Sequence, residues 1–188
     1  MTTRIRRALK LWRRNLDVFR EYYLASVIGN IGEPIIFLFG LGLGLGTMIE
    51  EVNGMSYLEF IAPGVMAVVA MNAAAFECTF SSYTRMVEQN IYEGILATPM
   101  SLEDIVLGEV MWGATKGVIS SFAVLLVLIV AGIFHEYAAI PLIVINMAAI
   151  GAAISGIALC VSAVAKSYEF FNFFITLFIG PMILFTGV

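Results

Sequence analysis

The chain has 188 residues, of which 61% are hydrophobic and only 13% are charged, and its mean hydropathy is +0.96. Soluble domains are about 45–50% apolar and about 25% charged, and disordered chains combine low hydrophobicity with much charge, so the composition excludes both classes. Two cysteines exclude a disulfide scaffold, and a net charge of −4 argues against a nucleic-acid binder. The composition therefore predicts an all-α, polytopic transmembrane helical bundle.

Residues 1–23 form a basic N-terminal arm, with seven of the ten Lys and Arg residues of the chain in the first twenty positions. Its apolar residues recur at the spacing of one helix face: Ile5, Leu9, Trp12, Leu16, Phe19 and Tyr23. A basic amphipathic helix with aromatic residues on its apolar face lies in the membrane interface. A signal peptide is the alternative, but no short apolar core followed by a small-residue cleavage site is present. We expect an interfacial amphipathic helix over residues 1–23.

Residues 24–188 carry the apolar runs. A bilayer core of roughly 30 Å requires about 20 apolar residues in a helix, which predicts five spans at about 24–48, 57–80, 113–134, 138–165 and 170–188. The last run ends without a polar tail, so we expect a truncated domain whose sixth span is missing.

The orientation follows from the remaining basic residues, which are Arg85, Lys116 and Lys166. All of them fall on the same side of the predicted spans as the arm, whereas the two opposite loops contain no Lys or Arg. The excess of basic residues marks the cytoplasmic side, which predicts a cytoplasmic N-terminus.

Glycines recur in the first predicted span at Gly40, Gly42, Gly44 and Gly46. A dinucleotide fingerprint needs a further glycine five residues after the first, and no GxxxxGK[ST] loop occurs in the chain, so the sequence contains no ATPase motif. Small residues four apart allow close helix packing in membranes. We interpret these glycines, and the pair Gly151 and Ser155, as helix-packing positions.

Polar residues at membrane depth are Glu33, Asn72 and Glu77. Such residues mark a substrate pathway or a pair by default. Snorkelling to the interface is the alternative for Glu77 and Lys116, and a helix–helix hydrogen bond is the alternative for Asn72. The single histidine, His135, excludes a histidine-based metal site, so neither a catalytic residue nor a metal ligand is predicted.

The segment 81–112 is the most informative connection. Val87, Ile91 and Ile95 have helical spacing, the Thr98-Pro99 step predicts a turn, and Ser101 to Asp104 predicts a capping box for a helix that continues into the third span. Connections between packed helices are commonly about 2–8 residues long. The extra length predicts a docking surface for a soluble partner.

Several stretches together resemble a known family: LASVIGN at 24–30, EPIIFLFGLGLGLG at 33–46, FIAPG at 60–64, IVLGE at 105–109 with Thr115-Lys116, Ser167-Tyr168, and Pro181-Met182. The chain resembles the ABC-2 type export permeases, most closely the nodulation protein J type. The resemblance implies six spans per permease, a homodimer in the bacterial inner membrane, and two separate ATP-binding subunits. ATP and Mg would then bind to the partner subunits and no cofactor to this chain.

The resemblance also places the coupling helix of the family at residues 85–101. It implies that the contacts with the ATPase come from this region, with a solvated helix face as the alternative for each residue: Arg85, Glu88, Tyr92, Glu93, Thr98, Pro99, Ser101 and Asp104. The implied function is export of an amphipathic substrate (a lipo-oligosaccharide, polysaccharide or drug) by alternating access. An ion-gradient-driven carrier or channel and a membrane scaffold are the alternatives, and co-purification of an ATP-binding protein would separate them.

Overall fold

The computed structural model of the chain describes residues 2–44 and 54–185, and these residues form an all-α bundle. The long helices are α1 (Thr2–Gly44), α2 (Tyr57–Phe76), α4 (Leu102–Val130) and α5 (Ile140–Val164). The shorter elements are the π-helical segments η2 (Glu77–Ser81), η3 (Thr84–Glu88) and η5 (Ile175–Ile179), the 3₁₀ turn η4 (Tyr137–Ala139), and the helices α3 (Ile91–Leu96), α6 (Glu169–Phe174) and α7 (Gly180–Leu184).

Three described helical segments are long and apolar enough to cross a membrane: Tyr57–Glu88, Leu102–Val130 and Tyr137–Val164. A shorter apolar segment, Glu169–Leu184, lies where the fifth span is predicted. The predicted first span falls in α1, but its residues 45–48 and the end of the fifth, residues 186–188, lie outside the described part. The all-α membrane bundle predicted from composition is confirmed.

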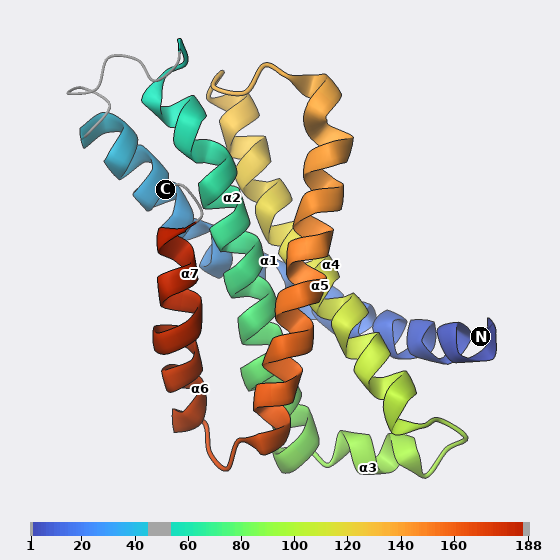
Figure 1. Cartoon of the computed structure of the whole chain (residues 1–188). Helices are drawn as coiled ribbons and strands as arrows, with labels where there is room; N and C mark the ends of the chain where they lie inside the picture. The colour runs from blue at the N-terminus through green and yellow to red at the C-terminus, as the bar shows by residue number, and fades with distance from the viewer. Residues whose placement is uncertain (1, 45–53, 186–188) are drawn as a thin grey trace.

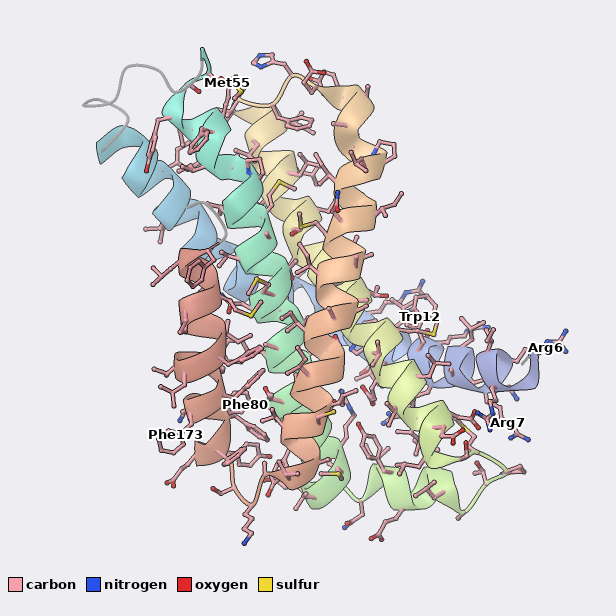
Figure 2. The ribbon with its side chains drawn as sticks, viewed as in Figure 1. Arg6, Arg7, Trp12, Met55, Phe80 and Phe173 are labelled. Atoms are coloured by element: carbon pink, nitrogen blue, oxygen red, sulfur yellow. The ribbon has the colours of Figure 1, made fainter. Side chains whose placement is uncertain are left out.

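Helix α1 changes direction near the predicted end of the arm, because Tyr22 departs from helical geometry with φ −127° and ψ 20°. The first part of α1 runs across the bundle axis and projects from it, whereas α2, α4 and α5 run along that axis (Figure 1). Arg6 and Arg7 lie near the free end of this arm, and Trp12 lies nearer to the bundle (Figure 2). The arm is thus a lateral element that crosses the bundle axis.

The arm buries only part of the predicted apolar stripe. Ala8, Leu11 and Phe19 are buried, whereas Ile5 and Leu9 are exposed. The buried positions face α4, since a Cβ atom added at Gly108 would contact both Ala8 and Leu11. The arm therefore packs Ala8 and Leu11 on the bundle together with Phe19 of the predicted stripe, and leaves the start of that stripe exposed.

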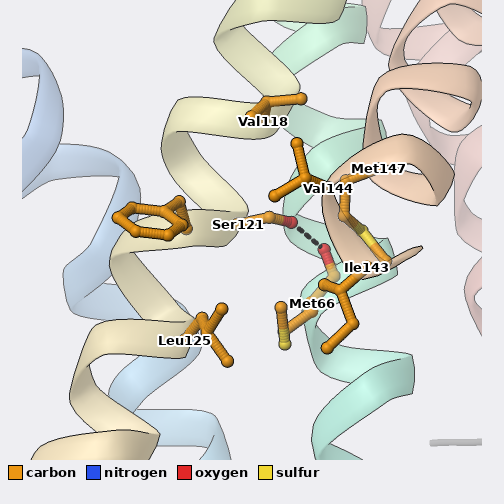
Figure 3. Close-up of a pocket in the computed structure, with 8 residues that line it drawn as sticks. Met66, Val118, Ser121, Leu125, Ile143, Val144 and Met147 are labelled. Carbon is orange, nitrogen blue, oxygen red and sulfur yellow. Dashed lines mark hydrogen bonds between the residues drawn. The ribbon is translucent and has the colours of Figure 1, made fainter. Parts of the chain in front are cut away.

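Helices α2, α4 and α5 share the main core. Ile61, Val65, Val124, Leu128 and Met147 are buried together toward the end that carries the α4–α5 connection. Ser121 Oγ of α4 donates a 2.5 Å hydrogen bond to the Met66 carbonyl of α2. The adjacent cavity of ≈ 10 Å³ is lined by Ser121 and otherwise by apolar side chains (Figure 3). That volume holds no more than about one water molecule, so this region is packed core.

The helix α4 begins at the predicted cap. Ser101 Oγ accepts the Asp104 N–H at 3.4 Å, and Asp104 Oδ2 accepts the Ser101 N–H at 3.0 Å, which forms the capping box. The preceding turn spans residues 97–99, around Thr98-Pro99. The predicted turn and cap are confirmed, and α4 then continues unbroken into the third predicted span as far as Val130.

Replacing Ser101 by Ala is expected to lower the free energy of unfolding by about 0.5–2 kcal/mol, because the Asp104 N–H loses its acceptor. Ser101→Thr keeps a hydroxyl in the same place and should retain most of the stability. Denaturant titration of the purified protein in detergent, followed by circular dichroism, measures both variants. Equal midpoints for Ser101→Ala and the parent would contradict a stabilising cap.

Candidate functional site

A buried ion cluster lies where the arm, the end of α2, α3 and α4 meet. Arg85 Nη1 lies 2.9 Å from Glu77 Oε1, and Arg85 Nη2 lies 2.8 Å from Glu109 Oε2. The exposed fractions of the side chains are 13% for Arg85, 5% for Glu77 and 0% for Glu109. A single guanidinium group therefore bridges two desolvated carboxylates from two different helices.

Two of the three residues of this bridge lie in the π-helical segments that follow α2. Glu77 begins η2 and Arg85 lies in η3. The wider π turn replaces the usual i→i−4 bond by one five residues away, and such segments occur frequently at functional sites. Here Ser82 Oγ donates to the Glu77 carbonyl at 3.3 Å and accepts from Arg85 Nη2 at 3.2 Å, which fixes the local backbone beside the ion pair.

Glu109 is the hub of the cluster. In addition to Arg85, it accepts a 2.9 Å hydrogen bond from Tyr92 Oη of α3 and a 3.3 Å hydrogen bond from Asn15 Nδ2 of the arm. Burial, together with the neighbouring Glu109 charge, raises the pKa of the Tyr92 phenol above its ordinary value. Tyr92 therefore remains protonated at neutral pH and donates to the carboxylate.

Lys116 completes the charge balance of the cluster. Its Nζ lies 3.9 Å from Glu77 Oε2 and 4.4 Å from the centre of the Phe19 ring, the latter a cation–π contact. Two carboxylates thus face two cations. Buried charges are tolerated when they are paired and hydrogen-bonded. Glu77 and Lys116 lie close enough to form such a pair.

The arm is attached to the same region by further contacts. Trp12 Nε1 donates to Thr115 Oγ1 at 2.9 Å, and the Phe19 and Trp112 rings meet edge to face at 5.7 Å. At the start of α4, Arg7 lies 3.6 Å from Asp104 and Arg4 lies 2.6 Å from Glu103. Movement of α4 at this point would carry the arm with it.

The predicted coupling residues fall into two groups in the structure. Glu88, Glu93, Thr98, Pro99 and the cap residue Ser101 are exposed. Tyr92 and Asp104 are buried and Arg85 is mostly buried, and each of these three is held by the contacts described above. The first group is therefore accessible to a partner subunit, whereas the second group is buried within this chain. The coupling role of both groups stays a prediction.

The polar residues predicted at membrane depth are separated by the fold. Glu77 joins the ion cluster, whereas Asn72 lies half-buried along α2. Glu33 lies in α1, but its side chain is outside the described part of the structure, as are Gly42 and Gly46.

The small residues of α4 and α5 lie at a close helix crossing. A Cβ atom added at Gly113 would collide with Ser155 Oγ and lie 2.7 Å from Cys78 Sγ, and one added at Gly151 would lie 3.0 Å from Ala114 Cα. At Gly40 of α1, no atom of the described residues would lie within 4 Å of an added Cβ. The two glycine sets thus differ in their surroundings within this chain.

Sequence reasoning missed Glu109 and Asn15, which only the fold brings together. One signal was available: Glu109 and Lys116 are polar residues two helical turns apart on one face of an apolar helix. The arm carboxamide gives no such signal, because Asn15 sits among basic residues on a helix whose partner the sequence does not specify.

The sequence was compared with protein families and with known proteins. Residues 8–188 match the family model of the ABC-2 type transporter. The chain is 39% identical over 179 residues to nodulation protein J of Rhizobium meliloti (strain 1021), covering 95% of this chain and 68% of the relative. It is 40% identical over 182 residues to nodulation protein J of Rhizobium leguminosarum bv. viciae, covering 95% of this chain and 69% of the relative.

A more distant relative is the inner membrane transport permease YadH of Escherichia coli (strain K12), 24% identical over 111 residues, covering 58% of this chain and 43% of the relative. No solved structure gives a significant match to the chain. On the family model and the two nodulation protein J relatives, the chain belongs to the ABC-2 type transporter family, as a membrane subunit that works with a separate ATP-binding subunit.

Proposed function

We propose that the chain is the permease half of an exporter that moves an amphipathic substrate out of the cytoplasm by alternating access. Two copies would form the pathway, and ATP and Mg would bind to the separate ATPase subunits. The substrate class we propose is a lipo-oligosaccharide, a polysaccharide or a drug, as the resemblance to the nodulation protein J type implies.

The observation that carries this proposal is the contact of α3 with the buried hub. Asn90 adopts a left-handed conformation with φ 52° and ψ 27°, and this breaks the helix before α3. Helix α3 then runs across the end of the bundle (Figure 1). Its Glu93 points outward, whereas its neighbour Tyr92 is buried and bonded to Glu109. A subunit that pushes on the outward side of α3 would displace Tyr92, and with it α4.

The distribution of charge supports a cytoplasmic location for the α3 end. Arg85 lies in η3, directly before α3, and Lys116 lies near Glu77 in the same cluster. The connection between α5 and α6, which contains Lys166, lies at the α3 end (Figure 1), and the basic arm contacts the start of α4. The opposite end of the described bundle carries His135 and Glu136. Basic residues are concentrated on the cytoplasmic side of membrane proteins, so the ATPase subunits would approach α3 from the cytoplasm.

Reversing Glu93 to Lys is expected to uncouple transport from ATP hydrolysis, because the change alters the exposed face of α3 without touching the buried cluster. The full-length permease is co-expressed with its ATP-binding partner, and export is measured in membrane vesicles alongside ATP hydrolysis. Export should fall at least about tenfold, the change expected if a charged contact worth about 1.4 kcal/mol is lost, while the permease remains inserted in the membrane.

Glu136→Lys provides the matched control, since Glu136 is equally exposed but lies at the opposite end of the bundle. Export by this variant should equal that of the parent. Undiminished export by Glu93→Lys would refute the role of α3, and export that follows an ion gradient without ATP would identify the secondary carrier instead.

A further inference from the structure

A cavity of ≈ 290 Å³ lies beside the ion cluster, between the arm, the end of α2 and α4. Arg14 and Tyr22 line it from the arm, Arg85 and Gln89 from the region after α2, and Trp112 from α4. A water molecule occupies about 30 Å³ in the liquid, and pockets for whole drug-sized ligands begin at about 300 Å³. The cavity therefore suits a headgroup-sized ligand.

The polar atoms of the cavity favour an anion. Arg85 uses Nη1 and Nη2 on Glu77 and Glu109, but its Nε is buried with no hydrogen-bond partner among the described residues. A buried donor without a partner costs about 1–3 kcal/mol, and an anionic oxygen could satisfy it only if the side chains that cover Nε moved aside. Arg14 Nη1 is held at 3.2 Å by Asn15 Oδ1, so a second guanidinium group is fixed in the same wall.

The formal charge around the cavity is also positive. The charged side chains that line the cavity are both arginines, Arg14 and Arg85. Glu77 and Glu109, which bind Arg85, do not line it. Arginine forms paired hydrogen bonds with phosphate oxygens better than any other side chain. The two arginines that line the cavity thus select a phosphate ester.

The remaining wall has the character of a membrane interface. Tyr22 and Val18 of the arm line the cavity and are each 45% exposed, and Trp112 forms its inner side. Tyrosine and tryptophan concentrate at the level of lipid headgroups. The kink at Tyr22 lies at this wall, at the point where the arm turns into the rest of α1.

From the two arginines that line the cavity and its interfacial aromatic wall, we propose that this cavity binds the phosphate-bearing headgroup of an anionic membrane lipid. The bound lipid would hold the arm against α2 and α4 and so stabilise the junction that contains Glu109. The proposal rests on the membrane location of the chain, and it does not depend on the direction of transport or on the ATPase.

The test uses the full chain purified in a neutral detergent and titrated with phosphatidylglycerol, with phosphatidylcholine and inorganic phosphate as parallel titrations. Phosphatidylglycerol should raise the midpoint of thermal unfolding in a saturable way, and phosphatidylcholine should not. Arg14→Gln should weaken this effect at least about tenfold, because it removes a charged hydrogen-bond donor, whereas Arg14→Lys should retain part of it.

Arg13→Gln is the matched control, because Arg13 is the adjacent arginine of the arm but is exposed and does not line the cavity. Its response to phosphatidylglycerol should equal that of the parent. Equal losses in Arg13→Gln and Arg14→Gln, or no saturable effect in the parent, would overturn the site. Saturation by inorganic phosphate at the same concentration would overturn the lipid as the source of the phosphate. Because neither export nor ATP hydrolysis is measured, failure here leaves the proposed transport function to its own experiment.

Discussion

Replacing Glu109 by Leu is expected to lower the free energy of unfolding by about 3–5 kcal/mol, the cost of removing one partner from a buried ion pair. The side chain is 0% exposed and accepts hydrogen bonds from Arg85, Tyr92 and Asn15. Without the carboxylate, Arg85 keeps only Glu77 as its charged partner within the cluster, and two further buried donors lose their acceptor. The loss should be measured by reversible denaturant unfolding in detergent, followed by circular dichroism.

Glu103→Leu is the matched control for this experiment. Glu103 belongs to the same helix and also forms an ion pair, with Arg4 at 2.6 Å, but its side chain is 67% exposed. Exposed ion pairs contribute about 0–1 kcal/mol, so this variant should unfold close to the parent. If Glu103→Leu and Glu109→Leu lose the same stability, Glu109 is not the hub that the geometry indicates.

Replacing Gly113 by Ala should also destabilise the bundle, by about 1–3 kcal/mol, because an added methyl group overpacks a close helix crossing. The new Cβ would meet Ser155 Oγ of α5 and Cys78 Sγ beside α2, so either α5 or η2 must shift. The effect opposes intrinsic propensity, since Ala is a better helix former than Gly by about 0.8–1 kcal/mol. The midpoint of thermal unfolding in detergent measures the balance.

Gly156→Ala tests the same substitution where space is open. No atom of the described residues lies within 4 Å of the added Cβ at Gly156 on α5, so this variant should be as stable as the parent or more stable. A Gly113→Ala protein that is also stabilised would show that the α4–α5 crossing is looser than these contacts require.

Local features of the chain were predictable because they depend on neighbouring residues. Pro99 forbids a helical conformation at the residue before it, and Ser101 with Asp104 begins the next helix. The end of the basic arm was likewise visible as a change in composition, and the helix departs from regular geometry at Tyr22. Each of these features could be predicted from residues that are close together in the sequence.

The site was not predictable in the same way. Glu109 and Arg85 are 24 residues apart, and Glu109 and Asn15 are 94 residues apart. No periodic pattern connects such positions, because their contact depends on how four elements cross. The arm shows the same limit: its predicted apolar stripe contains Ile5 and Leu9, yet the stripe packed on α4 contains Ala8 and Leu11.

By itself, the sequence determined that this is an all-α membrane protein with a basic amphipathic arm and a turn-and-cap element between two long apolar helices. Burial in a bilayer requires backbone hydrogen bonds to be satisfied within each helix. Hydropathy and helix signals are therefore sufficient to predict the all-α membrane fold. Only the tertiary structure decided which charges become buried partners, because a desolvated charge is tolerated only where the fold supplies its counter-charge. That is why Glu77, Arg85, Glu109 and Lys116, dispersed along the chain, form one cluster at the junction of the arm with α3.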